Sequence, residues 1–282
     1  MRILLLGKNG QLGLALTKLL ATKPVDLQAL SRAEADLEDT SRLANRLAQF
    51  RPDVTINCAA YTDVNTAERN PSLAMAVNDR AVKQLAKYCE GIQSKLVHFS
   101  TDYVFDGTKG RPYIETDATN PLNVYGKSKL LGEEAVTGSS EPWLVFRTSW
   151  VYGEGTNNFI SKLRSWAKGN EVLRIVDDEI SVPTSTRDIA KFTYLSIEKG
   201  ISGLFHLTSS GKASRYQYAL AIQKVFPEIR CAIEPARLSE FASEVARPSY
   251  SVLSNQRLAK VLETEIPHWK TSLEDSTQLI HS

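Results

Sequence analysis

The sequence is poor in the residue types that define several common classes of protein. Among its 282 residues there are three cysteines, which lie far apart without a C-x-x-C pair: Cys58, Cys89 and Cys231. This pattern indicates neither a disulfide framework nor a zinc site, so we expect three buried free thiols. The four histidines are scattered, without the spacing of metal ligands. We therefore expect a chain that holds no metal.

Charge of one sign and long apolar runs are also missing. The 34 basic and 32 acidic residues leave a net charge of +2, too little for the broad positive surface that nucleic-acid binding needs. The start, MRILLLG, has four consecutive aliphatic residues, too few for the apolar core of a signal peptide. No run approaches the ~18 apolar residues that span a bilayer. We expect a globular cytoplasmic protein that acts on small molecules and binds neither nucleic acid nor membrane.

The first 150 residues alternate short apolar runs with helical patterns. The strand-like runs are RILLL, DLQALS, VTINCAA, KLVHFS and WLVFRTS. Helices are expected between them, starting at Gln11, near Thr40, at Pro71 and around Tyr125. Strands that alternate with helices pair in parallel through right-handed crossovers. The sequence therefore predicts an α/β, doubly wound parallel-sheet (Rossmann) domain, whose ligands lie beyond the carboxyl ends of the strands.

The alternation loosens after Trp150. Helices are expected near 159–168 and 186–199 and from Tyr216, with strands at VLRIV and GLFHLT and a tail punctuated by proline. No repeat, low-complexity stretch or flexible linker separates the two parts. We expect an NAD(P)-binding domain over residues 1–150 and a smaller, mainly substrate-binding C-terminal lobe over 151–282, with elements near 184–208 returning to the sheet.

The first junction between strand and helix is rich in glycine. RILLLGKNGQLG places Gly7, Gly10 and Gly13 there. Backbone N–H groups can then approach a pyrophosphate at the start of a helix, where the helix dipole favours an anion. The G-x-x-G-x-x-G spacing differs from the G-x-G-x-x-G of most dehydrogenases, and a tight structural turn is the alternative. Its position between the first strand and the first helix favours a dinucleotide site.

The second strand ends at Ser31 and Arg32. NAD enzymes usually have an acid at this place, which accepts a hydrogen bond from the ribose 2′-hydroxyl, and neither residue is an acid. A hydroxyl and a guanidinium suit a 2′-phosphate instead, so we expect NADPH, with NADH as the alternative. Arg32 could equally be a solvated surface charge. Asp36 is expected to contact adenine or to cap the following helix.

Ser100 and Thr101 end the fourth strand, where the nicotinamide should lie. Thr101 is expected either to donate a hydrogen bond to a substrate oxygen or to cap a turn. Tyr125 and Lys129, in YGKSK, share one face at the start of a helix. An ammonium beside a phenol lowers its pKa from ~10, so Tyr125 could exchange a proton with a carbonyl while hydride moves. Lys129 would also hold the cofactor ribose.

With these motifs the chain resembles the extended short-chain dehydrogenases/reductases and, more narrowly, the dTDP-4-dehydrorhamnose reductase family. The resemblance spans almost the whole chain and rests on GKNGQLG, RPDVTINCAAYTDVNTAE, STDYVFDG, PLNVYGKSKLLGE, FRTSWVYG, NNF and ARPSYSVL. It implies three catalytic residues: Thr101, Tyr125 and Lys129. Around the cofactor it implies Gly7, Gly10, Gln11, Leu12, Gly13, Arg32, Asp36, Leu37, Ala59, Ala60 and Tyr61. For the sugar nucleotide it implies Thr62, Val64, Thr101, Asp102, Tyr103, Trp150 and, at the diphosphate, Arg247.

The implied reaction is the NADPH-dependent reduction of the C4 keto group of dTDP-4-dehydro-L-rhamnose to dTDP-L-rhamnose, in nucleotide-sugar and polysaccharide biosynthesis. Several residues depart from the family pattern. Asn65 stands where an aspartate is usual, Glu179 and Ser181 replace Gln and Gly, and Tyr250 replaces Asn. These changes leave open a different dTDP-linked 4-keto-6-deoxyhexose as substrate. Trp150 is expected to form a wall of the sugar pocket or, alternatively, to pack between the lobes.

Two other functions fit the same fold. An epimerase would retain NAD and carry an acid after the second strand, so Ser31 argues against it. A non-catalytic regulatory subunit would not need the Thr, Tyr and Lys set, which is intact here.

Some relatives dimerise around a divalent cation held by acidic residues. Ala15 and Arg187 occupy two such places, so a homodimer, if formed, is expected without a magnesium-bridged interface.

Overall fold

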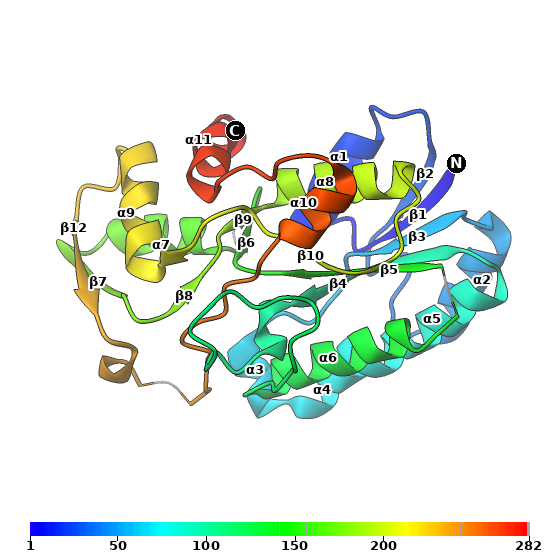
Figure 1. Cartoon of the computed structure of the whole chain (residues 1–282), viewed down its shortest axis with the longest axis horizontal. Helices are drawn as coiled ribbons and strands as arrows, with labels where there is room; N and C mark the ends of the chain where they lie inside the picture. Colours follow the sequence, from blue (N-terminus) through cyan, green and yellow to red (C-terminus); the bar gives the residue numbers. More distant parts are fainter. Residues whose placement is uncertain (141, 156, 243, 281–282) are drawn as a thin grey trace.

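A parallel sheet of six strands runs through the centre of the computed structural model, which describes residues 1–140, 142–155, 157–242 and 244–280 (Figure 1). In spatial order the strands are β10 (Gly203–His206), β5 (Trp143–Thr148), β4 (Lys95–Thr101), β3 (Val54–Asn57), β1 (Arg2–Leu6) and β2 (Asp26–Leu30). Since β2 and β3 lie on opposite sides of β1, the winding reverses there. The carboxyl ends of β1 and β3 thus flank the crevice in which such sheets bind ligands.

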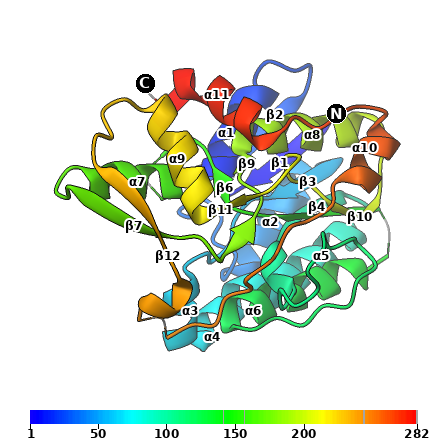
Figure 2. The ribbon, with the colours of Figure 1, turned by 60° about the vertical axis from the view of Figure 1, so that its left-hand side comes forward.

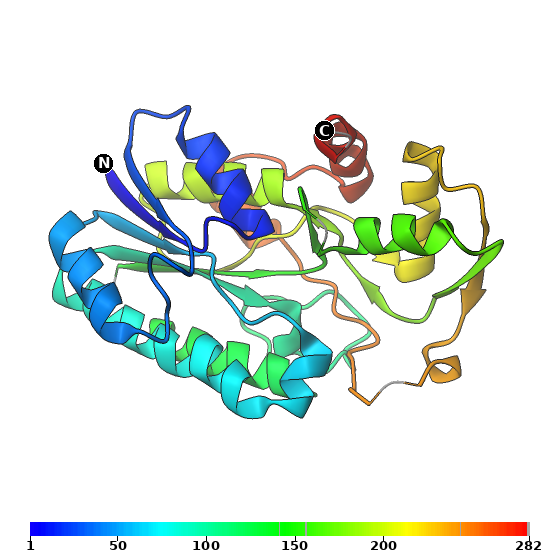
Figure 3. The same cartoon turned by 180° about the vertical axis from the view of Figure 1, so that it is seen from behind.

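Helices cover both faces of the sheet (Figures 1 and 3). One face carries α1 (Gln11–Leu20), α8 (Thr186–Glu198) and α10 (Gln256–Leu262), and the other carries α2 (Thr40–Phe50), α5 (Ala81–Gly91) and α6 (Val124–Thr137). Alternate residues of β1 serve the two cores: Ile3 and Leu5 face α1 and α8, whereas Leu4 and Leu6 face α2 and α5. Burial on both faces explains why the strands read as nearly continuous apolar runs.

The segment between β3 and β4 contains an irregular helix. After α3 (Val64–Arg69), α4 (Pro71–Met75) continues through a π-helical turn, η1 (Ala76–Arg80), into α5. Asn78 lies in this turn and is fully buried. Its side chain accepts a hydrogen bond from the Tyr61 N–H (2.9 Å) and donates to the Tyr61 carbonyl (2.9 Å) and to Ser128 Oγ of α6 (3.0 Å). The π-helical turn therefore ties the loop after β3 to α6.

A second hydrophobic core lies beside the carboxyl end of the sheet (Figure 2). It is centred on Tyr218 and Trp269, both buried. Its helices are α7 (Phe159–Ala167), α9 (Arg215–Val225) and α11 (Trp269–Ile280). Outside this core, η2 (Asp102–Val104) and η3 (Leu238–Glu240) are single 3-10 turns. Its paired strands are β7 (Val172–Val176) with β12 (Ala232–Ala236), β6 (Val151–Tyr152) with β9 (Thr184–Ser185), and β8 (Ile180–Ser181) with β11 (Ala213–Ser214).

The predicted fold class is confirmed: β10 is an edge strand of the parallel sheet, and α8 packs in the same core as α1. The division at residue 150 into a cofactor domain and a substrate domain stays a prediction. Sequence reasoning did not anticipate α3, β12, α10 or α11. The thiols are free, but Cys58 is only partly buried, unlike Cys89 and Cys231. Within the described ranges, no helix is both long and apolar enough to cross a membrane.

Candidate active site

A cavity of about 250 Å³ opens at the carboxyl ends of β1, β2 and β3. We call it the glycine-loop cavity. Its walls include eight of the residues predicted to surround the cofactor: Gly7, Gly10, Arg32, Asp36, Leu37, Ala59, Ala60 and Tyr61. Asn9, Ala35, Cys58 and Val77 complete the lining. The topological crevice and the predicted dinucleotide site thus coincide.

The glycine loop brings bare backbone to this cavity. Gly7 has a φ of +83°, and a Cβ atom on Gly13 would collide with the carbonyl oxygen of Gly7. Helix α1 starts directly after Gly10 without a side-chain cap. The Gln11 side chain is turned away, bonded to the Asn157 carbonyl (3.0 Å) and to the Asn158 amide (2.9 Å), while Leu12 packs in the core. An anion can therefore reach the first amides of α1.

The end of β2 differs from expectation. Ser31 is buried, and it donates from its N–H (2.8 Å) and its Oγ (2.6 Å) to Glu34. Because the chain turns back after Arg32, the carboxylate of Glu34 lies at the end of β2, where the sequence analysis expected no acid. Arg32 is exposed and pairs with Asp36 (3.0 Å) and Glu38 (3.1 Å). Asp36 is not the cap of α2, since Asp39 fills that position.

The three predicted catalytic residues, which we call the catalytic cluster, come together at the carboxyl end of β4. Thr101 ends this strand, and Tyr125 lies in the first turn of α6, which is capped by Asn123. The hydroxyls of Thr101 and Tyr125 are hydrogen-bonded. Thr101 also accepts a bond from the Tyr103 N–H (3.2 Å), so it caps a turn as well. Both roles considered for Thr101 are compatible with this position.

Lys129 lies one turn further along α6 and is 3% exposed. Its Nζ donates to the carbonyl oxygen of Phe99 (2.6 Å) and lies 3.5 Å from His98 Nε2. Asn57 Oδ1 accepts from the Ala59 N–H (3.1 Å), which turns Asn57 Nδ2 toward His98 Nδ1 (3.3 Å). His98 Nδ1 must then accept, so the ring proton is on Nε2, facing Lys129.

This arrangement makes the Lys129 ammonium easier to deprotonate. Desolvation lowers the pKa of Lys129 to about 8, against the opposing charge of Glu133. Desolvation, followed by the charge of Lys129, also holds the pKa of His98 well below its usual value. Glu133 is itself paired with Arg147 of β5 in the core. Lys129 is therefore a buried base that exchanges its proton near neutral pH.

The expected lowering of the Tyr125 pKa is wrong for the protein alone. Burial raises this pKa to about 12, and the negative charge of Asp102 adds to the effect, while the bond to Thr101 opposes it. Lys129 does not lower it, because its ammonium is directed at Phe99 and His98. Tyr125 consequently keeps its proton at neutral pH. That suits a group which donates a proton to a substrate.

Comparison with known proteins identifies the family. The sequence pattern described as the RmlD substrate binding domain matches residues 1–281. A dTDP-4-dehydrorhamnose reductase from Burkholderia thailandensis is 40% identical over 286 residues, covering 96% of this chain and 96% of that protein. The chain belongs to the RmlD family.

Two solved structures of RmlD-type proteins share the fold over their full length. A dTDP-4-dehydrorhamnose reductase from Clostridium acetobutylicum superimposes with a TM-score of 0.96 at 34% identity, covering 100% of both chains. A dTDP-4-dehydrorhamnose reductase from Bacillus anthracis, in complex with NADP, gives a TM-score of 0.93 at 30% identity and 98% coverage of both chains. The similarity therefore includes both hydrophobic cores.

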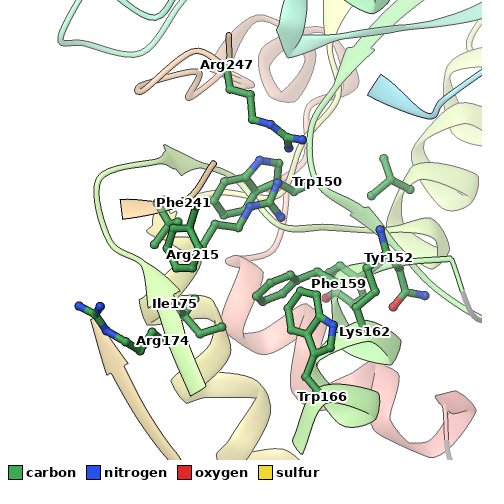
Figure 4. Close-up of a pocket in the computed structure, with 13 residues that line it drawn as sticks. Trp150, Tyr152, Phe159, Lys162, Trp166, Arg174, Ile175, Arg215, Phe241 and Arg247 are labelled. Carbon is green, nitrogen blue, oxygen red and sulfur yellow. The ribbon is translucent and has the colours of Figure 1, made fainter. Parts of the chain in front are cut away.

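A second cavity, of about 470 Å³, lies in the part of the RmlD fold beyond the catalytic cluster. We call it the aromatic cavity (Figure 4). Trp150, Tyr152, Phe159, Trp166 and Phe241 give it five aromatic walls. Trp150 has a left-handed backbone, with φ +40°, and its indole N–H is buried without a protein partner. A buried donor of this kind suits a ligand that carries an acceptor.

Three arginines line the aromatic cavity (Figure 4), and Arg174 is paired with Glu240. The guanidinium of Arg215 lies 3.5 Å from the centre of the Trp150 ring and 3.4 Å from Glu179. Arg247, predicted at the diphosphate, donates to Asn65 Oδ1 (2.9 Å). Because Asn65 replaces the aspartate usual in the family, this partner is neutral and leaves the charge of Arg247 available to an anion.

The other predicted substrate residues occupy different environments. Asp102 is 2% exposed, and its carboxylate accepts from Thr101 (3.2 Å), Ser181 (3.1 Å) and Ser251 (2.5 Å). Burial raises the pKa of Asp102 to about 6. Its side chain thus links the catalytic cluster to the second core.

Tyr103 packs edge-on against Tyr125, with ring centres 5.8 Å apart. Thr62 and Val64 lie at the start of α3, where Thr62 is exposed and Val64 half-buried. Ser100 is buried in β4, and its hydroxyl has no partner in the protein. None of these residues lines the aromatic cavity.

Sequence reasoning missed four residues that shape the site: Glu34, Asn57, Asn78 and Arg215. Glu34 stands three residues after Ser31, the spacing of a capping box, and that signal was available. Arg215 follows Ser214 at the start of a helix and shows no pattern of its own. Asn57 and Asn78 act through buried contacts with partners far away in the sequence.

Proposed function

We propose that this chain is an NADPH-dependent reductase that converts dTDP-4-dehydro-L-rhamnose to dTDP-L-rhamnose. The observation that carries the proposal is the position of the catalytic cluster between two cavities. On one side, Lys129 connects through two buried polar side chains to Ala59 in the wall of the glycine-loop cavity. On the other side, Tyr103 packs against Tyr125. The positive charges of Arg215 and Arg247, which line the aromatic cavity, act on the pKa of Tyr103.

The glycine-loop cavity fits a dinucleotide. The absence of a Cβ on Gly13 lets the Gly7 carbonyl lie against the start of α1, so backbone amides are left to receive a pyrophosphate. Arg32 and Asp36 would flank the adenosine at the rim. Lys129 would hold the nicotinamide ribose. When bound, reduced nicotinamide supplies the hydride that adds to the C4 carbonyl carbon.

The catalytic cluster supplies the proton. As the carbonyl oxygen gains negative charge, Tyr125 transfers its phenolic proton to that oxygen, which becomes the C4 hydroxyl. Thr101 donates a hydrogen bond to the same oxygen and holds it beside the phenol. Lys129, with its pKa near 8, returns a proton to the phenolate. Thr101 and Lys129 are buried and Tyr125 is half-buried, so water has limited access to the proton.

The aromatic cavity would hold the dTDP part of the substrate. Flat side chains such as Trp150 and Phe159 suit a pyrimidine ring, and Arg215 and Arg247 suit a diphosphate. In this arrangement the part of the chain that forms the six-stranded sheet would bind the dinucleotide, and the part around the second core would bind the sugar nucleotide. We place the reaction in the cytoplasm.

A different dTDP-linked 4-keto-6-deoxyhexose is the second candidate substrate. Ser181, at a position where the family usually has Gly, donates to Asp102 behind Thr101. Glu179, where the family usually has Gln, pairs with Arg215. Both contacts lie beside the route from the catalytic cluster to the aromatic cavity, where the stereochemistry of the sugar would be sensed.

The test is to follow NADPH absorbance while the purified protein meets a panel of nucleotide 4-keto sugars, and to identify each product by NMR. Turnover with dTDP-4-dehydro-L-rhamnose and a rhamnose product is the expected result. Turnover with another sugar alone would select the second candidate. No turnover with any sugar, under conditions where NADPH binds, would point to a regulatory subunit of the same fold.

A further inference from the structure

The carboxylate of Glu34, whose neighbour Ala35 lines the glycine-loop cavity, lies within reach of three donors. It accepts from the Ser31 N–H at 2.8 Å, from Ser31 Oγ at 2.6 Å and from Lys8 Nζ at 2.7 Å. Lys8 belongs to the glycine loop, whereas Glu34 belongs to the turn after β2. This ion pair therefore joins two of the segments that enclose the cavity.

The turn places Glu34 where a dinucleotide presents its adenosine ribose. The N–H groups of Glu34 (3.1 Å) and Ala35 (2.9 Å) both donate to the carbonyl of Ser31, which folds the chain back onto the last residue of β2. Ala35 lines the cavity itself, and so do the neighbours of Lys8 in the glycine loop. In dinucleotide-binding folds, an acid at this point of the sheet bonds to the ribose 2′-hydroxyl.

We propose that Glu34 sets the choice between NADH and NADPH by competing with the 2′-phosphate for Ser31 and Lys8. This inference rests on the proposed function. With NADH, Glu34 stays in place and accepts a hydrogen bond from the 2′-hydroxyl. With NADPH, the 2′-phosphate takes over the three donors and Glu34 swings out into solvent.

The charges explain why the two anions exclude each other. A carboxylate and a phosphate within one hydrogen-bonded cluster repel, and a single ammonium cannot neutralise both. The contacts with Lys8 and Ser31 lower the pKa of Glu34 to about 2, so the carboxylate is charged at any pH at which the protein works. Its side chain is 43% exposed, so it can move into water without disturbing the core.

A local structural role is the competing explanation. Ser31-x-x-Glu34 has the spacing of a capping box, in which a glutamate stabilises one turn and nothing more. That role predicts equal changes in the affinity for both cofactors when Glu34 is altered. A competitor for the 2′-phosphate predicts changes of opposite sign.

The decisive variant is Glu34→Gln in the full-length protein, which keeps the size of the side chain and removes its charge. Dissociation constants for NADPH, NADH, 2′,5′-ADP and 5′-AMP are measured by calorimetry, without any sugar substrate. We expect binding of NADPH and 2′,5′-ADP to tighten about tenfold, as expected for loss of one competing charge, and binding of NADH to weaken several-fold.

Glu228→Gln is the matched control. Glu228 pairs with Arg164 at 2.8 Å, and its exposed fraction, 44%, nearly equals that of Glu34. It lies on the surface in the turn between α9 and β12, away from the glycine-loop cavity, so its loss should leave all four dissociation constants unchanged. Lys8→Met tests the same site from the other side, and it should weaken NADPH binding far more than NADH binding.

Parallel changes in NADPH and NADH affinity for Glu34→Gln, or none, would overturn the inference and leave the capping role. The same holds if Lys8→Met affects both cofactors equally. Failure of the proposed function looks different. In that case the unaltered protein would bind neither cofactor, or would bind both and reduce no sugar.

Discussion

The catalytic cluster and the rim of the glycine-loop cavity treat charge in opposite ways. Lys129 is buried and Tyr125 half-buried, and desolvation shifts the pKa of each toward the neutral form, to about 8 and about 12. Arg32 is exposed and Glu34 half-exposed, and hydrogen bonds hold each in its charged form. In the cluster the shifted pKa values prepare groups to exchange protons, whereas a phosphate at the rim would be recognised by full charges that water can replace.

The two regions also differ in what a substitution should cost. In the catalytic cluster, the burial that shifts the pKa values also lowers the free energy of unfolding. A substitution there should therefore change both turnover and stability. At the rim, solvent screens each pair and the folded state hardly depends on it. The following experiments test this contrast, from the largest expected effect to the smallest.

Tyr125→Phe should lower turnover about 10²- to 10⁴-fold, the usual contribution of a positioned general acid. The ring remains, so the dissociation constant for NADPH should change little. Steady-state kinetics and calorimetry measure the two quantities. Tyr194→Phe makes the same chemical change in a buried tyrosine on the opposite face of the sheet and should leave turnover intact. Near-normal turnover in Tyr125→Phe would remove this residue as the proton donor.

Lys129→Met should abolish most turnover yet stabilise the fold. The folded-state pKa of about 8 lies below the ordinary value of 10.5, so the buried ammonium destabilises the protein fully below that folded pKa. The penalty fades as pH rises from about 8 toward 10.5, because the folded protein then holds Lys129 neutral. After loss of the bond to Phe99 is subtracted, the gain should be on the order of 2 kcal/mol at neutral pH.

Urea denaturation of the unaltered protein and of Lys129→Met, at about pH 7 and about pH 10, measures this gain. The difference in unfolding free energy should shrink at the higher pH. A gain that is the same at both values would mean that burial of the charge is not its source. A loss of stability at neutral pH would show that the bond to Phe99 outweighs desolvation.

Trp150→Phe should raise the KM for the sugar nucleotide about tenfold, because the smaller ring offers Arg215 and the ligand a weaker platform. Either ring must adopt the same left-handed backbone, so thermal stability should change little. A tryptophan that served only as core would instead cost on the order of 3 kcal/mol on truncation. A variant that melts far earlier yet binds the sugar nucleotide normally would contradict the pocket role.

Arg32→Ala should have the smallest effect, raising the KM for NADPH by about fivefold or less and that for NADH hardly at all, as for an exposed ion pair. The side chain already pairs with Asp36 and Glu38, which limits its gain from a phosphate. Higher salt should reduce the difference between the cofactors. Equal changes for both cofactors would remove Arg32 from the 2′-phosphate.

The sequence was most informative where one segment determines its own structure. The apolar runs of β1 and β4 specify buried parallel strands, and the glycines after Leu6 specify a loop that joins strand to helix. Tyr125 and Lys129 could be placed on one helical face from their spacing alone. Those inferences needed only local geometry.

Contacts between distant segments were harder to predict. The pKa of Tyr125 was predicted in the wrong direction, because it depends on burial and on where Lys129 points. Lys129 is in turn directed by His98 and Asn57, 31 and 72 positions away. Strand β12 pairs with β7, and both β12 and α11 pack in the second core. Neither has a local sequence pattern that predicts this packing. Contacts of this kind belong to the fold rather than to any stretch of it.

The π-helical turn at Ala76–Arg80 has a consequence for how the chain tolerates length changes. A turn of this type holds one residue more than the α-helix around it, so α4 and α5 are out of phase by one residue, about 100° of rotation. Deleting a single residue there would let one regular helix run from Pro71 to Gly91. It would also rotate Asn78 away from Tyr61 and Ser128, releasing the loop beside the glycine-loop cavity. The irregular turn thus sets the rotation of α5 relative to α4. With this rotation, one long helix contacts two partners that an uninterrupted helix could not contact at once.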